Sequence, residues 1–196
     1  RATAVDGAGG VTLDRYVSLL RSGGVVACPT ETLFGLLADA LDEQAVARVS
    51  AIKRRRSSDP IAVIVPSFKA VLALAAELPP AARELGKRHW PGPLTLVLRA
   101  RPGLPAALTR DGKIGMRVPG PSPALDLVRA FGGPLTATSA NRTSEPAAVI
   151  AEQVRANLGD EVDAVIDGTA PGGLASTVLD ATTDPPLLLR AGAVEP

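Results

Sequence analysis

The chain has 196 residues with 21 basic and 20 acidic side chains, so its bulk charge gives no case for a general nucleic-acid binder. Aromatic residues make up only 3% of the sequence, which argues against a surface that stacks bases on aromatic rings. A single cysteine, Cys28, and a single histidine, His89, exclude an internal disulfide, a cysteine zinc site and a multi-histidine metal site.

The length and the hydropathy pattern favour one soluble domain. No apolar run approaches the roughly 18–20 residues that a membrane helix needs, and no signal-peptide pattern opens the sequence. Hydrophobic residues make up 46% of the chain, which is enough for a core. We therefore expect a single domain over residues 1–196, in the cytoplasm and without a membrane segment.

Helical and extended segments alternate along the sequence. Apolar residues recur at helical spacing after Thr12, and Asp42 can cap a second helix with Ala45, Val49 and Ile52 on one face. The first expected helix is capped by Thr12 and stopped by Gly23-Gly24, and the second is capped by Asp42 and runs into the basic residues 53–56. The other expected helices are one from Ser67 to before Pro79, one from there to Arg88, 123–131 and 150–158. The expected strands are 25–28, 61–65, 94–99, 114–118, 135–138, 164–166, 177–179 and 187–189. Because the alternation lacks a strict βαβ rhythm, it predicts an α/β fold with a mixed, twisted sheet and flanking helices.

A basic run, Lys53-Arg54-Arg55-Arg56, follows the second helix. The sequence has no P-loop and no dinucleotide-binding glycine turn, so a nucleotide would need another device to hold its phosphates. The run allows two interpretations: a solvated helix cap that favours the helix dipole, or a phosphate clamp. Lys53 and Arg55 both lie off the apolar stripe, so replacing either with alanine is expected to change stability by about 0.5 kcal/mol or less.

Hydroxyl and amide side chains gather beside several predicted strands. They occur in Pro29-Thr30-Glu31-Thr32, in Thr138-Ser139-Ala140-Asn141 and in Ser176-Thr177, where they could cap a turn or bind a polar ligand. Arg117 lies within an apolar strand and Arg190 ends another, so each needs a partner if it is buried. The turn 90–93, His89 and Cys28 are interpreted as structural.

These segments, taken in order, resemble the YrdC family, the threonylcarbamoyl-AMP synthases, over residues 29 to 192. The segments are Pro29-Thr30-Glu31-Thr32-Leu33-Phe34-Gly35, Lys53-x-Arg55, Trp90-Pro91-Gly92-Pro93-Leu94-Thr95-Leu96-Val97-Leu98, Met116-Arg117-Val118-Pro119, Thr138-Ser139-Ala140-Asn141, Ser176-Thr177-Val178 and Leu189-Arg190-x-Gly192. The resemblance implies a YrdC-like (DHBP synthase-like) fold with a positively charged concave pocket. It also implies the short, single-domain form of the family.

The resemblance further implies a reaction and its binding residues. L-Threonine, bicarbonate and ATP would give threonylcarbamoyl-AMP and pyrophosphate, and a partner complex would use the product for N6-threonylcarbamoyladenosine at position 37 of tRNA. Mg²⁺ would arrive with ATP rather than on protein ligands. The implied threonine-binding residues are Thr32, Arg117 and Ser176. The implied nucleotide-binding residues are Lys53, Arg55, Ser139, Asn141 and Arg190, of which Lys53 and Arg55 would be catalytic.

The chain departs from the family pattern at five positions. Phe34 replaces the usual Tyr, Leu37 replaces Gly, Arg54 and Arg56 replace Gly and Pro, and Ser144 replaces Gly. Two alternatives stay open from the residues. One is a carbamoyl-transfer module that makes carbamoyl-adenylate, and the other is a non-catalytic domain that binds RNA weakly through a cationic concave face.

Overall fold

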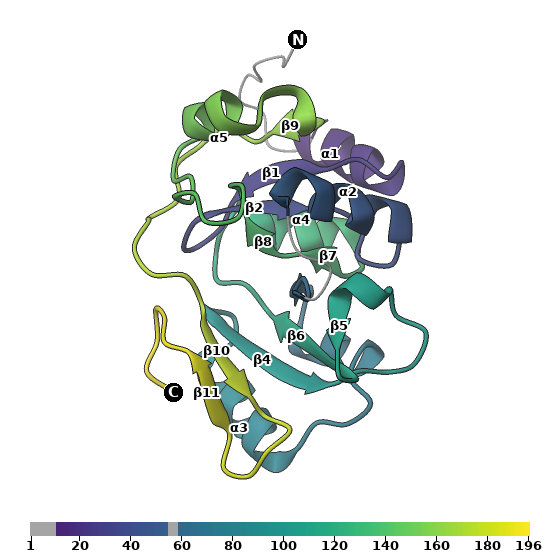
Figure 1. Cartoon of the computed structure of the whole chain (residues 1–196), viewed down its shortest axis with the longest axis vertical. Helices are drawn as coiled ribbons and strands as arrows, with labels where there is room; N and C mark the ends of the chain where they lie inside the picture. Colours follow the sequence, from purple (N-terminus) through teal and green to yellow (C-terminus); the bar gives the residue numbers. More distant parts are fainter. Residues whose placement is uncertain (1–10, 55–58) are drawn as a thin grey trace.

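The structure, a computed structural model, describes residues 11–54 and 59–196 (Figure 1). Its α-helices are α1 (Val11–Arg21), α2 (Glu43–Lys53), α3 (Pro80–His89), α4 (Pro123–Phe131) and α5 (Ala151–Leu158). Its 3-10 helices are η1 (Phe68–Ala73), η2 (Ala106–Leu108) and η3 (Gly159–Glu161). Its strands are β1 (Val26–Pro29), β2 (Phe34–Leu37), β3 (Val63–Ile64), β4 (Leu94–Arg99), β5 (Thr109–Arg110), β6 (Lys113–Arg117), β7 (Leu135–Thr136), β8 (Thr138–Ser139), β9 (Ala164–Val165), β10 (Thr177–Asp180) and β11 (Leu187–Arg190).

The described strands form two sheets. The smaller has the order β8-β2-β1-β9, and the larger has the order β11-β10-β4-β6-β3-β7 with β5 paired to β6. The pairs β1–β9, β4–β10 and β3–β6 are parallel, whereas their other neighbours are antiparallel. The α/β fold with mixed sheets that the sequence predicts is therefore confirmed.

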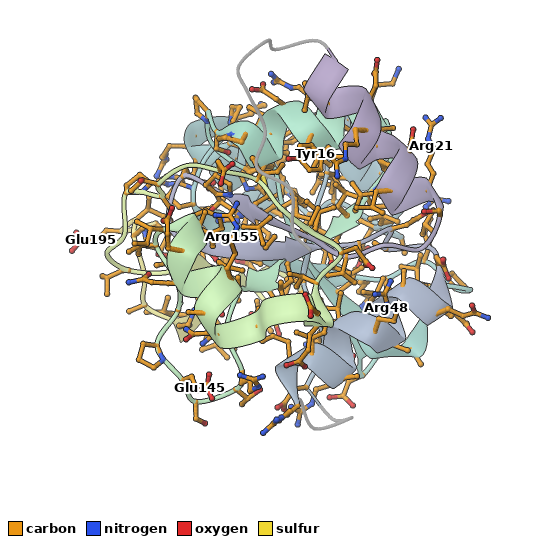
Figure 2. The ribbon with its side chains drawn as sticks, turned by 90° about the horizontal axis from the view of Figure 1, so that it is seen from above. Tyr16, Arg21, Arg48, Glu145, Arg155 and Glu195 are labelled. Carbon is orange, nitrogen blue, oxygen red and sulfur yellow. The ribbon has the colours of Figure 1, made fainter. Side chains whose placement is uncertain are left out.

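Helices pack around both sheets. In Figure 1, α1, α2, α4 and α5 gather around the smaller sheet, while α3 lies against the larger one. Ion pairs fasten two of these helices: Arg48 of α2 binds Asp163, and Arg155 of α5 binds Asp167, with both arginines labelled in Figure 2. Both pairs tie a helix to residues that flank β9 of the smaller sheet.

The predicted second helix is confirmed. Asp42 accepts hydrogen bonds from the backbone N–H groups of Gln44 and Ala45, at 2.9 and 3.3 Å, and so caps α2. The apolar stripe of α2 is buried, as helical spacing predicts. The strand 94–99 and the helix 123–131 also have the predicted bounds.

Three expectations about local structure are wrong. The segment after Ser67 forms the short 3-10 helix η1 rather than an α-helix reaching Pro79. The predicted strand 135–138 is divided, since β7 pairs with β3 in the larger sheet and β8 pairs with β2 in the smaller one. The strand β2 was not expected, because Gly35 interrupts a short run that has no alternation of polar and apolar residues.

Candidate active site

A pocket of about 760 Å³ lies between the two sheets. This volume is within the range of small-molecule and cofactor sites. Seven of the eight residues expected to bind ligands line it: Thr32, Lys53, Arg117, Ser139, Asn141, Ser176 and Arg190. The eighth, Arg55, lies outside the described residues, as does Arg56. The fold therefore brings together side chains that are up to 158 positions apart in the sequence.

Lys53 is buried at the end of α2, where only 4% of it is exposed. Its Nζ donates hydrogen bonds to the Ser139 carbonyl oxygen at 2.7 Å, to Ser139 Oγ at 3.2 Å and to Asn141 Oδ1 at 2.6 Å. The interpretation of Lys53 as part of a solvated cap is thus wrong. Because this buried ammonium group donates three hydrogen bonds, we now expect its removal to lower stability by more than the sequence alone suggests.

The loop after β8 is held against α2 by further bonds. Thr143 donates its backbone N–H and its hydroxyl to the Lys53 carbonyl oxygen, at 2.9 and 2.8 Å. Asn141 donates from Nδ2 to the Glu145 carbonyl oxygen. Ser139 and Asn141 therefore present their polar groups to the pocket from a loop with a fixed backbone.

The turn between β1 and β2 forms another part of the wall. Thr30 Oγ1 accepts from the backbone N–H groups of Thr32 and Leu33, at 3.1 and 3.3 Å, and donates to the Leu33 carbonyl oxygen at 2.8 Å. The hydroxyls of Thr30 and Thr32 lie 3.1 Å apart. These bonds place both hydroxyls at the pocket surface, where Thr32 was expected.

Arg117 of β6 has an acidic partner in this same turn. Its Nη1 donates to Glu31 Oε1 at 3.1 Å, and the two side chains are 9% and 12% exposed. Burial lowers the pKa of Arg117, Glu31 opposes that change, and the positive charge of Arg190 adds to it. A buried Arg117 was expected to need a partner, and Glu31 is that partner.

Ser176 links two other pocket residues. Its Oγ lies 2.9 Å from Thr95 Oγ1 and accepts from Arg190 Nη2 at 3.1 Å. The Ser176 carbonyl oxygen accepts from Nε and Nη2 of Arg190, at 3.1 and 2.8 Å. Gly192 allows this arrangement, because a Cβ atom there would lie 2.3 Å from the Ala175 carbonyl oxygen.

The larger sheet forms a floor with three rows of side chains. Strand alternation turns Arg117, Gly115 and Lys113 of β6 toward the pocket, whereas the intervening Ile114 and Met116 are fully buried. In register, β10 pairs Val178 with Thr95 and Asp180 with Val97, but the side-chain contacts run diagonally, from Thr95 to Ser176 and from Lys113 to Asp180. Taken along these diagonals, the lining side chains form a polar row with Arg117, Thr95 and Ser176, an apolar row with Gly115, Val97 and Val178, and an ionic row with Lys113 and Asp180. Four residues along a strand span about 13 Å, which is the separation of the two outer rows.

The ionic row consists of a close pair. Lys113 Nζ lies 2.7 Å from Asp180 Oδ2, and Thr182 donates its backbone N–H and hydroxyl to Oδ1. Burial raises the pKa of Asp180, but the hydrogen bonds from Lys113 and Thr182 and the charge of Lys113 outweigh it, so the pKa is lowered overall.

Basic residues outnumber acidic ones around the described part of the pocket. The basic lining residues are Lys53, Arg110, Lys113, Arg117 and Arg190, and the acidic ones are Asp59, Asp111 and Asp180. Such a lining suits anionic ligands, although the whole chain is nearly neutral. Residues 11–54 and 59–196 contain no group of three or more His, Cys, Asp or Glu side chains that could hold a metal ion.

The departures from the family pattern have distinct structural settings. Phe34 and Leu37 are fully buried in β2 and line the pocket, so both alter its wall. Arg54 and Ser144 have left-handed backbones, with φ of 49° and 73°. Glycine adopts this conformation without strain, whereas other residues do so at a cost, which accounts for the family's usual glycine at both positions.

Five residues of the pocket or in contact with its lining had no role predicted from the sequence: Glu31, Thr95, Lys113, Gly115 and Asp180. Glu31 and Thr95 stand inside segments that carry the family resemblance, so a signal for them existed. Lys113, Gly115 and Asp180 lie outside those segments, and only the register of β6 and β10 reveals that they face the pocket. In contrast, Cys28 is fully buried and, like His89, does not line the pocket.

The fold and the pocket define an α/β protein with a basic pocket between two sheets, and comparison with known proteins agrees with this fold. A family model named Sua5_yciO_yrdC and described as "Telomere recombination" matches residues 18–192. The threonylcarbamoyl-AMP synthase of Idiomarina loihiensis is 36% identical over 161 residues, which cover 79% of this chain and 84% of that protein. The chain belongs to the Sua5/YciO/YrdC family.

Two further similarities involve Pyrococcus abyssi. Its threonylcarbamoyl-AMP synthase is 40% identical over 177 residues, which cover 89% of this chain and 52% of that protein. The crystal structure of P. abyssi Sua5 complexed with L-threonine superposes with a TM-score of 0.90 and 36% identity, over 95% of this chain and 56% of that one. The chain spans about half the length of the relatives from P. abyssi and Bacillus subtilis. None of the helices in the described residues has the length and apolar character needed to cross a membrane.

Proposed function

We propose that the chain is a threonylcarbamoyl-AMP synthase that condenses L-threonine, bicarbonate and ATP and releases pyrophosphate. The observation that carries the proposal is the meeting of seven expected ligand-binding residues in one pocket with a basic lining. Every proposed substrate has an anionic group, so such a pocket can attract all three. The names of the relatives and the threonine complex of P. abyssi Sua5 support the same activity.

The polar row of the floor is the proposed threonine site. Arg117 supplies guanidinium N–H groups that can bind a carboxylate at two points. Thr32 and Ser176 supply hydroxyls beside it, and both are mostly buried. A threonine bound there would direct its amine toward the middle of the pocket.

The nucleotide would bind beside the threonine, with its triphosphate and its adenine in different parts of the pocket. The triphosphate would lie near Ser139, Asn141 and Arg190, with Arg55 as a further contact. Lys53 would keep the loop with Ser139 and Asn141 in place and supply positive charge next to the phosphates. The adenine would lie on the apolar row, where Gly115 leaves room for a flat ring.

The chemistry would proceed in two steps. The threonine amine attacks CO2 with loss of a proton, or bicarbonate with loss of water, to form an N-carboxylate. This carboxylate attacks the α-phosphorus of ATP and expels pyrophosphate. Catalysis would come from positioning and from charge stabilisation at the transferring phosphoryl group, without a covalent intermediate on the protein. Mg²⁺ would be bound with ATP, mainly by phosphates and water.

The product would then serve a threonylcarbamoyl-transferase complex that modifies adenosine 37 of tRNA, which places the proposed activity in the cytoplasm. The adenylate is a reactive mixed anhydride, so the next reaction must be attack by a nucleophile on its carbonyl group. The amino group of an adenosine is such a nucleophile.

Ligand-dependent thermal unfolding and pyrophosphate release test the proposal. Millimolar ATP should raise the melting temperature and threonine should raise it further, with serine less effective because it lacks a methyl group worth about 1 kcal/mol or less. Pyrophosphate release should require both threonine and bicarbonate. An absence of any shift with ATP and threonine would contradict the proposal.

The same measurements separate the two alternatives. If carbamoyl phosphate replaces threonine and bicarbonate in pyrophosphate release, the chain is a carbamoyl-transfer module. If neither reaction occurs but RNA binds with an affinity that falls steeply with salt, it is a binding domain.

A further inference from the structure

Glu31 does not line the pocket, although its neighbours Thr30 and Thr32 do. Its carboxylate lies behind Arg117 and joins the β1–β2 turn of the smaller sheet to β6 of the larger one. We propose that Glu31 is a positioning residue that holds the Arg117 guanidinium in the orientation that binds the threonine carboxylate. The inference rests on the proposed function and goes beyond it, because it concerns how the threonine site is kept in shape.

The backbones on both sides of the pair are fixed. The hydroxyl of Thr30 closes the turn that carries Glu31. The Arg117 carbonyl oxygen accepts a backbone hydrogen bond from Val65 at 2.9 Å, and this bond extends the pairing of β6 with β3. The direction of the guanidinium therefore depends on what its own N–H groups contact.

The Glu31 carboxylate is the contact that the structure provides. Arg117 Nη1 donates to Glu31 Oε1, and no other hydrogen bond of the Arg117 side chain is found among the described residues. The remaining guanidinium donors can thus serve a ligand. Arginine has five N–H donors in a planar fork, so one contact with Glu31 still permits a two-point contact with a carboxylate.

Gly120 keeps the Glu31 side chain from moving away from Arg117. A Cβ atom at position 120 would lie 2.9 Å from Glu31 Cγ, so the glycine backbone packs directly against that side chain. Glu31 is therefore held between Gly120 on one side and Arg117 on the other. An anion confined in this way can fix a cation more firmly than a side chain with several accessible rotamers.

Charge gives a second reason for the arrangement. Arg190 is close enough to Arg117 to help lower its pKa, so the two guanidinium groups repel each other. Glu31 compensates for this repulsion and for the burial of Arg117. Without the carboxylate, Arg117 would turn away from Arg190 and its donors would no longer meet a carboxylate placed beside Ser176.

The environment of Glu31 Oε2 supports the proposal that Glu31 orients the Arg117 guanidinium and does not merely fill space. It is buried and has no hydrogen-bond partner among the described residues. An unpaired buried carboxylate oxygen is costly. The fold tolerates this cost while the other oxygen serves Arg117.

Steady-state kinetics of Glu31→Gln, Arg117→Gln and the double variant test the assignment. In Glu31→Gln, we expect the KM for threonine to rise about tenfold or more, as for loss of a charge-assisted hydrogen bond, while the KM for ATP changes less than about twofold. The double variant should resemble Arg117→Gln alone, because Glu31 acts through Arg117. Asp167→Asn breaks an ion pair whose two residues do not line the pocket and is the control, with both KM values unchanged.

Each other outcome is decisive. If Glu31→Gln leaves the KM for threonine unchanged, or raises both KM values equally, Glu31 has only a structural role and the inference fails. If Glu31→Gln does not fold, Glu31→Asp keeps the charge and shortens the side chain, and it must raise the threonine KM selectively. If the unaltered protein shows no threonine-dependent pyrophosphate release, the proposed function fails, and the assignment fails with it.

Discussion

Lys53 Nζ lies 2.6 Å from Asn141 Oδ1, a hydrogen bond that joins residues 88 positions apart. It connects the last residue of α2 to the loop that follows β8. Because Lys53 also binds the carbonyl and hydroxyl oxygens of Ser139, one ammonium group contacts two of the side chains expected to bind the nucleotide, those of Ser139 and Asn141. A residue predicted from its charge to contact phosphate is therefore also part of the scaffold.

Replacing Lys53 with alanine should affect both stability and activity. Three hydrogen bonds from a buried, charged donor to Ser139 and Asn141 are lost, so the free energy of unfolding should fall by about 2–4 kcal/mol. Adenylate formation should fall about a hundredfold or more, as when one charge-stabilising donor is removed. Chemical denaturation and pyrophosphate release measure the two effects.

Arg129→Ala is the control for Lys53→Ala. Arg129 is an exposed residue of α4, and its Nε lies 3.5 Å from the Pro66 carbonyl oxygen. Its removal should change stability by about 0.5 kcal/mol or less. Equal stability of both variants would contradict the buried role of Lys53. For Arg55→Ala, the prediction from the sequence stands: turnover should fall, and stability should change little.

The α/β fold and most of the residues that line the pocket could be predicted from the sequence, but the tertiary contacts of those residues could not. The order of short segments was enough to collect Thr32, Arg117 and Ser176, because a motif keeps its residue types wherever the chain runs. Burial of Lys53 was not accessible, since it depends on contacts with residues 86 and 88 positions later. The division of 135–138 between two sheets was hidden for the same reason, since one continuous run pairs with two different partners.

Replacing Ser144 with glycine should stabilise the protein. Ser144 has φ of 73° and is exposed, so glycine removes the steric cost of a left-handed backbone without loss of packing. The expected gain in the free energy of unfolding is about 0.5–1 kcal/mol. Thermal denaturation compares it with Ser18→Gly in α1, where glycine in a helix should destabilise by about 0.5 kcal/mol. A loss of stability in Ser144→Gly would contradict the backbone strain that we infer at this residue.

Lys113→Met should lower the free energy of unfolding at neutral pH and lower it by less in acid. The folded pKa of Asp180 is lowered, so its stabilisation is present above the ordinary carboxyl value of about 3.9 and is lost as pH falls through the lower folded value. The difference in unfolding free energy between the variant and the unaltered protein should therefore shrink below about pH 4. Urea denaturation at several pH values measures it, and a constant difference would contradict the pairing.

Gly192→Ala should disturb the threonine site through the backbone. An added Cβ atom would lie 2.3 Å from the Ala175 carbonyl oxygen and 2.5 Å from the Thr177 nitrogen, so the segment must move and Arg190 must leave Ser176. We expect a loss of about 2 kcal/mol of stability and weaker binding of threonine. Gly103→Ala, which meets open space, should lose only about 1 kcal/mol and keep binding. Equal behaviour of the two variants would exclude the proposed role of Gly192.

The apolar row of the pocket floor predicts a selective effect of Gly115→Val. A Cβ atom at position 115 would lie 3.3 Å from Ala62 Cβ and 3.4 Å from Thr95 Cγ2, which requires only small shifts, so the variant should fold. The rest of the valine side chain would project over the surface on which we place the adenine. Binding of ATP and AMP should therefore weaken about tenfold or more, since a blocked ring loses its apolar contact.

Ligands that lack a nucleobase provide the internal control for Gly115→Val. Pyrophosphate and threonine would contact other parts of the pocket, so each should still raise the melting temperature of the variant as much as it raises that of the unaltered protein. Calorimetric titration with AMP, pyrophosphate and threonine separates the possibilities. Equal weakening of all three would indicate general damage to the pocket, and unchanged AMP binding would place the base elsewhere. Loss of AMP binding alone would assign the row with Val97 and Val178 to the nucleobase.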